Sequence, residues 1–432
     1  MTSDLATAQA LLDLIEASPS PFHAVRSVIQ RLEAKGFTPL GEADAWKLVP
    51  GARHYVVRQG SSLLAFVVAD RPPAETGFRM VGSHSDSPNL RLKPRPEAKS
   101  QHGYRQLAVE VYGGVLLSTW LDRDLAVSGR VFVKGEDAPR LLRVTRPLCR
   151  VPNLAIHLDR EVNDAGLKLN AQSHMPPVIG LSGDVTDPNW MRAFVASELQ
   201  VEADRIIAQD LMLHDTQTPV LSGLEREFVH APRLDNLGSC HASLEALLRS
   251  LDAGPPPATC AFVVYDHEEV GSETAQGAAS SFLESALERI VLARGGGREE
   301  FRRAIAQSLF VSADMAHAIH PNRADRHEPG HAPVLNGGPV IKVNSNQRYA
   351  TDASTASRFL SLAQEADVPV QYFVTRSDLP CGSTIGPITA SRLGLPTVDV
   401  GNPMLSMHSC REMAGARDPE LMVRVLTRLF RS

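Results

Sequence analysis

The sequence has few of the features that mark secreted, membrane-spanning or disulfide-bonded proteins. Its 432 residues include five cysteines, none in a CxxC pair, and this odd, scattered set predicts reduced thiols. No apolar run approaches the length that a bilayer crossing needs. The start, Met1–Leu5, lacks the basic residues and apolar core of a signal peptide. These absences predict a cytoplasmic protein without a membrane partner.

Positive charge is also in short supply. The net charge is −5 at pH 7 and no stretch gathers Lys and Arg into a stripe, so a nucleic-acid partner is not expected. No GxxxxGK[ST] or GxGxxG pattern precedes a helix, which argues against a phosphate-binding loop. The segment Pro380–Ser383 lacks the pattern of a serine nucleophile elbow, and we interpret it as a tight structural turn.

Helical and strand-like patterns alternate over most of the chain. This alternation predicts an α/β fold, with a parallel or mixed sheet flanked by helices. The length exceeds what one ordinary core holds, so two units are expected. Helices are predicted at 4–17, 22–34, 237–251, 281–294, 354–365 and 418–430, and strands at 54–58, 63–69, 79–84, 260–266, 308–314, 369–375 and 396–401.

A different period appears between these α/β stretches. Apolar and polar residues alternate over 105–112 and 125–133, as in half-exposed antiparallel strands, and a helix is predicted only near 188–199. The strand ending at His84 already belongs to the α/β pattern, so the β-rich segment is expected to be an insertion. The predicted units are a discontinuous α/β domain, 1–91 and 226–432, and an inserted β-rich domain, 92–225.

The most informative short segment is the adjacent pair Glu268 and Glu269. It follows the apolar run Cys260–Val264, which predicts a buried strand with the pair beyond its carboxyl end. Two adjacent carboxylates resist desolvation unless a cation lies between them. Metal hydrolases need such a pair, one carboxylate to bind metal and the other to move protons. The alternative is a solvated acidic turn.

Further metal-binding residue types stand where predicted strands end or a helix begins, the usual place of an α/β active site. With Glu269 they form a mixed N/O set that suits Zn²⁺, Mn²⁺ or Co²⁺. Five ligands exceed the need of one tetrahedral zinc, and a shared carboxylate can bridge two ions about 3.5–4 Å apart. Singly, each residue has a structural alternative, such as a helix N-cap for an aspartate. The set is His84, Asp235, Glu269, Asp314 and His408.

The order of these motifs resembles that of the M18 aspartyl aminopeptidase family, over essentially the whole chain. Ser85 stands where family members commonly carry Thr. The resemblance implies an α/β metallopeptidase domain with an inserted dimerisation domain, and a tetrahedral dodecamer built from dimers. The segments that carry it are 18–25, 82–88, 156–158, 233–237, 266–272, 312–318, 342–350, 380–387 and 407–412.

The resemblance also implies catalytic roles. Two divalent ions per subunit, Zn²⁺ above Mn²⁺ or Co²⁺, would share Asp235 as a bridge. Glu268 would be the general base, and Asp86 would orient His84 or the base, as carboxylates beside metal ligands do. The implied ligands are His84, Asp235 and Asp314 for one ion, and Asp235, Glu269 and His408 for the other.

The implied substrates are peptides with a free N-terminus and an acidic first residue. By resemblance, Lys342, Tyr349 and His317 would line the substrate pocket, and His157 would reach the site of a neighbouring subunit. The alternative for Lys342 and Arg348 is a pair of surface charges on a strand and its turn.

Two other functions fit the same residues. A related dinuclear-zinc carboxypeptidase or deacylase would use this ligand set but would anchor a substrate carboxylate. A metal-stabilised scaffold protein would keep the ligands with a silent site, although the intact Glu268 beside Glu269 argues against it.

Overall fold

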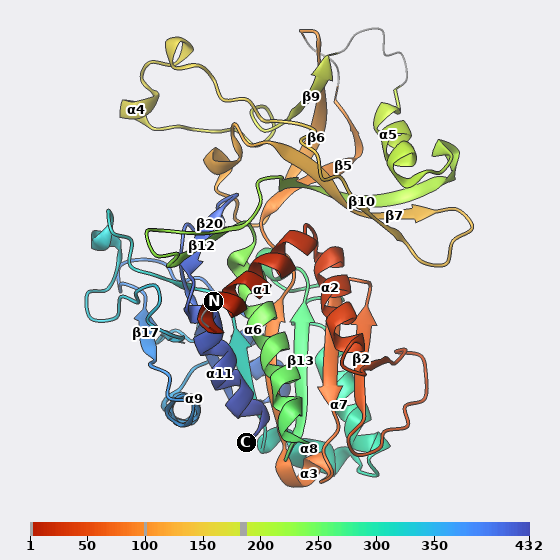
Figure 1. Cartoon of the computed structure of the whole chain (residues 1–432), viewed down its shortest axis with the longest axis vertical. Helices are drawn as coiled ribbons and strands as arrows, with labels where there is room; N and C mark the ends of the chain where they lie inside the picture. The colour runs from red at the N-terminus through yellow and green to blue at the C-terminus, as the bar shows by residue number, and fades with distance from the viewer. Residues whose placement is uncertain (1–2, 99–101, 182–187) are drawn as a thin grey trace.

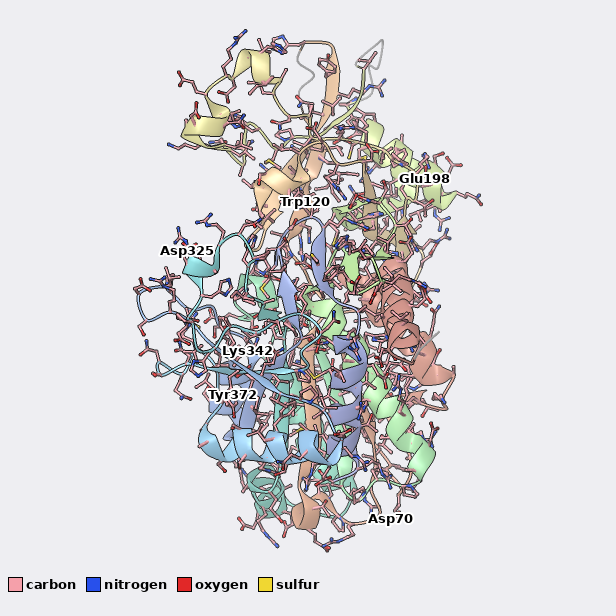
Figure 2. The ribbon with its side chains drawn as sticks, turned by 60° about the vertical axis from the view of Figure 1, so that its left-hand side comes forward. Asp70, Trp120, Glu198, Asp325, Lys342 and Tyr372 are labelled. Atoms are coloured by element: carbon pink, nitrogen blue, oxygen red, sulfur yellow. The ribbon has the colours of Figure 1, made fainter. Side chains whose placement is uncertain are left out.

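The computed structural model describes residues 3–98, 102–181 and 188–432. Figure 1 shows two parts, a layered α/β part below and a β-rich part above it. Figure 2 places Lys342 within the α/β part and Trp120 near the junction with the β-rich part. Within the described ranges, no helix combines the length and apolar composition that a membrane crossing requires.

A nine-stranded mixed sheet forms the centre of the described α/β part. Strands β13, β4, β14 and β18 are parallel, whereas β3 and β16 are antiparallel to their inner neighbours. In spatial order the strands are β1 (Thr38–Pro39), β2 (Arg53–Arg58), β3 (Ser62–Val67), β13 (Thr259–Tyr265), β4 (Phe78–His84), β14 (Leu309–Ala313), β18 (Thr397–Gly401), β16 (Val340–Val343) and β17 (Gln371–Val374).

Helices cover both faces of this sheet. Phe262 and Val311 point toward α2, α6, α9 and α11, whereas Val263 and Phe310 point toward α7, α8 and α10. Successive side chains of a strand face opposite ways, so β13 and β14 are buried throughout their length. The helices are α1 (Ser3–Ala17), α2 (Pro21–Glu33), α3 (Pro73–Thr76), α6 (Leu234–Ser250), α7 (Phe282–Ala293), α8 (Arg298–Ala306), α9 (Ala353–Glu365), α10 (Ile385–Leu393) and α11 (Asp418–Phe430).

The β-rich part has its own six-stranded sheet and its own apolar core, which includes Leu107, Val127 and Val131. It is entered directly from the main sheet, because β5 begins five residues after β4 ends at His84. Its helices are α4 (Val162–Ala165) and α5 (Trp190–Leu199). Its strands are β8 (Arg140–Arg143), β7 (Leu125–Val133), β10 (Ile206–Asp215), β5 (Asn89–Glu97), β6 (Tyr104–Tyr112) and β9 (Val178–Leu181).

A small third sheet joins segments that are distant in the sequence. Strand β20 pairs with both β12 and β19, and β19 pairs with β15. The pairing places the segments around His317 and Glu412 on opposite sides of β19. The strands are β11 (Val220–Ser222), β12 (Phe228–Ala231), β20 (Glu412–Gly415), β19 (Pro403–Leu405) and β15 (Ala316–His317).

The predicted α/β class with a mixed sheet is confirmed, and the closing helix and the strand at 125–133 have the predicted bounds. Four helices have no counterpart in the prediction, the one-turn helices α3 and α4 and the longer α8 and α10. Helix α8 begins at Arg298, directly after three glycines, and Glu300 accepts a hydrogen bond from the N–H of Gly297. Helix α10 holds Pro387 in its first turn, where a missing N–H breaks no helical bond.

Candidate metal centre

The centre forms where the carboxyl ends of three neighbouring strands meet. His84 is the last residue of β4, and Asp314 directly follows β14. Glu268 and Glu269 lie in the 3₁₀ turn η5 (Glu268–Val270), just after β13. Because β13, β4 and β14 are adjacent and parallel, their ends lie at one edge of the sheet, where ligands of α/β proteins bind.

Asp235 lies between the two histidines. It belongs to the first turn of α6, but its backbone is not helical (φ −81°, ψ 105°), and regular helix starts at Leu237. Its Oδ1 is 3.4 Å from His84 Nε2, and its Oδ2 is 3.4 Å from His408 Nε2. One carboxylate therefore presents a separate oxygen to each imidazole, the arrangement of a bridging ligand.

The remaining ligand candidates lie on either side of Asp235. Asp314 Oδ1 is 3.6 Å from His84 Nε2, and Glu269 Oε2 is 3.3 Å from His408 Nε2. Three groups of three have their ligand atoms within 4.8 Å of one another: His84 with Asp235 and Asp314, Asp235 with Glu269 and His408, and His84 with Glu268 and Glu269. Glu268 Oε2 lies slightly further out, 3.9 Å from His84 Nε2.

The charge balance of this cluster calls for cations. Burial, with help from the carboxylate of Asp235, raises the pKa of Glu269 well above its ordinary value. Burial and the nearby carboxylates likewise raise the pKa of Glu268 to about 8, although His84 opposes the shift. Asp235 Oδ1 and Glu269 Oε1 are buried with no hydrogen-bond partner in the described structure. Divalent ions such as zinc fit this set, because they would fill both gaps and offset the repulsion.

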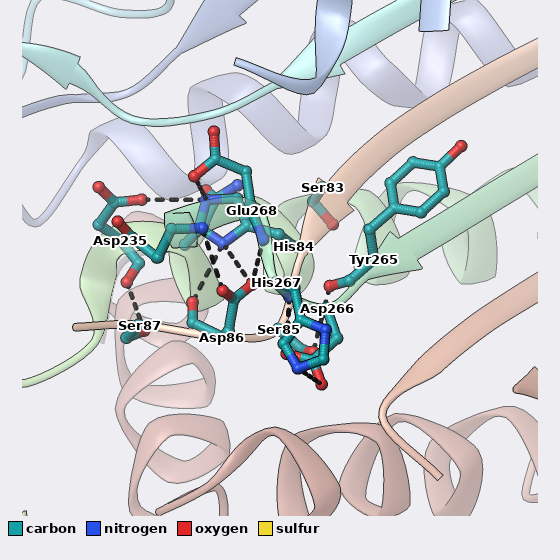
Figure 3. A network of polar contacts seen from close by, with 12 residues as sticks. Ser83, His84, Ser85, Asp86, Ser87, Asp235, Tyr265, Asp266, His267 and Glu268 are labelled. Atoms are coloured by element: carbon teal, nitrogen blue, oxygen red, sulfur yellow. Dashed lines mark hydrogen bonds and ion pairs between the residues drawn. The ribbon is translucent and has the colours of Figure 1, made fainter. Parts of the chain in front are cut away.

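Asp86 organises one side of the centre from a fully buried position. Its carboxylate accepts the backbone N–H groups of Glu268 at 3.2 Å and of Glu269 at 3.1 Å. Its backbone carbonyl lies 3.0 Å from His84 Nδ1, which leaves the Nε2 of that ring facing the other ligands (Figure 3). Asp86 thus touches both the imidazole and the turn of the carboxylate pair, the two groups it was predicted to orient.

Glu412 organises the other side, a role that no residue pattern predicted. Its Oε2 accepts the N–H of Asp235 at 3.1 Å, and its Oε1 accepts the N–H of His408 at 2.7 Å. The first residue of β20 therefore positions two ligand residues through their backbones. We noted Glu412 only as the end of a motif, because contacts to backbone amides leave no residue pattern.

A cleft of about 420 Å³ opens beside the centre and is lined by Glu268 and Asp314. Lys342, Tyr349 and His317 line the same cleft, as their predicted role requires. Lys342 is 2% exposed, so a surface charge was the wrong alternative for it, whereas Arg348 is exposed. The Nζ of Lys342 donates to the Met315 carbonyl at 3.2 Å and lies 3.5 Å from Asp314 Oδ2.

Comparison with known proteins decides the family. The family model described as Aminopeptidase I zinc metalloprotease (M18) matches residues 14–430. The chain belongs to the M18 aminopeptidase family. The probable M18 family aminopeptidase 2 of Ectopseudomonas mendocina is 50% identical, over 98% of each chain.

Solved structures agree with this M18 membership. Ape4, from its complex with Nbr1, superposes with a TM-score of 0.95 at 41% identity, over 99% of this chain and 86% of that one. The mApe1 dodecamer of S. cerevisiae gives a TM-score of 0.85 at 30% identity, over 98% and 96% of the two chains.

Membership makes this M18 protein a zinc metallo-aminopeptidase, as the resemblance implied, and sets aside the carboxypeptidase, deacylase and scaffold alternatives. One prediction differs from the structure in detail. The turn at Pro380–Ser383 is more than structural, because Gly382 and Ser383 line the cleft. His157 lies in the exposed turn η2 (Ile156–Leu158) and does not line the cleft of its own subunit.

Proposed function

We propose that this M18 aminopeptidase holds two divalent ions, most readily zinc, and removes acidic residues from peptide N-termini. The observation that carries the two-ion site is the placement of Asp235, whose oxygens face His84 and His408 at equal distances of 3.4 Å. The proposed ligands of one ion are His84, Asp235 and Asp314, and those of the other are Asp235, Glu269 and His408.

Ions bound there supply a water molecule with a pKa near neutrality and polarise the substrate carbonyl. Glu268 lines the cleft but lies further from His84 than the proposed ligands do. We assign it the role of general base, which takes a proton from the attacking water and returns it to the departing amine. Asp86 keeps the Glu268 backbone in place by accepting its N–H.

The cleft supports an acidic first residue. Lys342 is the buried cation of its wall, and Tyr349 lies beside it, with the Lys342 Nζ 5.1 Å from the ring centroid. A side-chain carboxylate that reaches Lys342 would gain a charge-assisted hydrogen bond away from bulk water. His317, which also lines the cleft, packs edge-on against Phe373, with 5.6 Å between the ring centroids.

Removal of metal tests the proposal most directly. Dialysis against a chelator is expected to abolish peptide hydrolysis, because neither the water nor the carbonyl is then activated. Titration with zinc, followed by elemental analysis, should restore activity as the second equivalent per subunit binds. Full activity at one equivalent would contradict the two-ion site. The same titration with Mn²⁺ and with Co²⁺ tests the alternative ions.

Replacement of Lys342 by methionine tests the acidic preference. We expect kcat/KM for Asp-p-nitroanilide to fall by about 10- to 100-fold, the effect of one charge-assisted hydrogen bond, with little change for Leu-p-nitroanilide. Arg348→Met is the matched control, because Arg348 is an exposed cation in the same segment. Faster cleavage of the Leu substrate by the unaltered enzyme would refute the preference, and N-acetylated Asp-p-nitroanilide should not be cleaved.

We further propose that residues 92–225 form a dimerisation domain and that dimers build a dodecamer. The related mApe1 of S. cerevisiae is a dodecamer, which supports the number of subunits. The exposed position of His157 supports its predicted role in the site of a neighbouring subunit. Gel filtration with light scattering would measure the assembly. The cytoplasmic location stays a prediction.

A further inference from the structure

One segment of the β-rich part reaches into the metal centre. It runs from Tyr112, at the end of β6, to Thr119 in the 3₁₀ turn η1 (Leu117–Trp120), and we call it the Tyr112–Thr119 loop. The loop contacts the centre on two sides, at His408 and at Asp86.

On the first side the loop holds His408 by its ring and by its backbone. The carbonyl of Gly114 lies 3.0 Å from His408 Nδ1, and the N–H of Leu116 donates to the His408 carbonyl at 3.1 Å. Thr119 Oγ1 accepts the N–H of Cys410 at 2.9 Å. A carbonyl on Nδ1 sets the tautomer and orientation of a ligating imidazole, which leaves His408 Nε2 for the ion.

On the second side the loop holds the turn of the carboxylate pair. The hydroxyl of Tyr112 donates to Asp86 Oδ2 at 2.6 Å, and this same oxygen accepts the N–H of Glu269. The Tyr112 ring is itself fixed, because the guanidinium of Arg91 lies 3.5 Å from its centroid. Gly113 passes so close to Glu269 that an added Cβ would lie 3.1 Å from the Glu269 Cβ.

These contacts fall unequally on the two groups of ligands. His408 is held by the loop directly, whereas Glu269 and His84 are reached by it only through Asp86. Among the described residues, no hydrogen bond joins the loop to His84, Asp235 or Asp314. The group of His84, Asp235 and Asp314 thus has only this indirect link to the loop, whereas the other group also has a direct hydrogen bond between the loop and a ligand ring, at His408.

We propose that the Tyr112–Thr119 loop is a positioning element that couples the inserted part to one metal site. The affinity for the ion at Asp235, Glu269 and His408 depends on the position of the loop. The affinity for the ion at His84, Asp235 and Asp314 depends on that position much less. This inference rests on the two-ion site proposed above. A rearrangement of the inserted part, for example on association of subunits, would then change the loading of one ion selectively.

Gly114→Ala is the sharpest test, because the new Cβ would lie 3.1 Å from His408 Nδ1 and would displace the ring. Zinc binding is measured by competition with a chelator of known affinity. We expect the ion at Asp235, Glu269 and His408 to bind about 10- to 100-fold more weakly, the usual effect of changing a residue that holds a metal ligand. The affinity for the ion at His84, Asp235 and Asp314 should change little. Gly180→Ala, in β9 of the same sheet, is the matched control, since nothing lies within 4 Å of its added Cβ.

Tyr112→Phe tests the second side of the loop. Without the hydroxyl, Asp86 loses one hydrogen-bond donor and holds the turn of Glu269 less firmly. The ion at Asp235, Glu269 and His408 should therefore bind more weakly. Tyr372→Phe is the control, because Tyr372 is 37% exposed on β17.

Amide hydrogen exchange of the unaltered protein gives a readout that no variant can confound. The second equivalent of zinc should slow exchange over 113–119. The ion fixes His408, whose backbone carbonyl accepts the N–H of Leu116.

The outcomes separate the two proposals. If the unaltered protein binds one zinc per subunit, the proposed function fails. If it binds two but Gly114→Ala holds both as tightly as Gly180→Ala does, or loses both equally, the coupling is overturned. Should Gly114→Ala not fold, unchanged exchange over 113–119 on the second equivalent would overturn it.

Discussion

Glu268→Gln is expected to retain both zinc ions and to lose about 10²–10⁴-fold in kcat, the usual contribution of a general acid–base group. The amide keeps the size of the side chain and its place in the cleft but accepts no proton. Glu268 lies further from His84 than Asp235 and Asp314 do, 3.9 Å against 3.4 and 3.6 Å, so its loss should spare the ligand set. Steady-state kinetics and elemental analysis on one preparation measure both effects.

Glu273→Gln is the matched control for this variant. Glu273 lies in the same loop but is exposed, and its replacement should leave kcat and zinc content unchanged. Loss of one zinc equivalent from Glu268→Gln would make Glu268 a ligand. Retention of activity with both ions bound would remove it from the role of base.

Asp235→Asn should have the largest effect of any single substitution. Both proposed ions share this carboxylate, and its two oxygens face two different imidazoles. An amide offers one neutral oxygen, so neither ion keeps its full set and the charge that balances both is lost. We expect zinc content well below two equivalents and a fall in kcat/KM of about 10³-fold or more, because activation by metal is worth several kcal/mol.

Asp252→Asn provides the comparison, because Asp252 is exposed just after the same helix. Its zinc content and activity should equal those of the unaltered enzyme. Two tightly bound zinc ions in Asp235→Asn would show that the carboxylate does not bridge. Thermal unfolding of both variants without metal checks that the fold is intact.

The elements of the α/β part were predictable because their signals are local. The buried run before Glu268 became β13, and the helix predicted from Leu237 is the regular part of α6. Helix α10 was not predicted, because Gly382 and Pro387 suggest a turn. In the structure Thr384 caps this helix, and its Oγ1 also donates a hydrogen bond to Asp399 at 2.6 Å. The cap depends on a contact between residues 15 apart, which periodicity does not show.

The candidate ligands were predictable as residue types at the ends of elements, and the structure gathers all five into one cluster. Of their partners, only Asp86 was predicted, and through the family resemblance alone. Glu412 and Asp86 act through backbone amides, and Gly114 acts through a carbonyl that every residue carries. Such contacts require particular positions in space and no particular side-chain pattern.

The sequence by itself determined the alternation of helix and strand, the β-rich insertion pattern after His84, and a mixed N/O ligand set suited to Zn²⁺, Mn²⁺ or Co²⁺. The tertiary structure alone decided that β4 lies between β13 and β14, which brings His84 to Glu268 and Asp314. It also decided that Lys342 is buried and that a loop of the inserted part holds His408. Periodicity and residue type report on neighbours along the chain, whereas strand order and burial depend on how distant segments pack together.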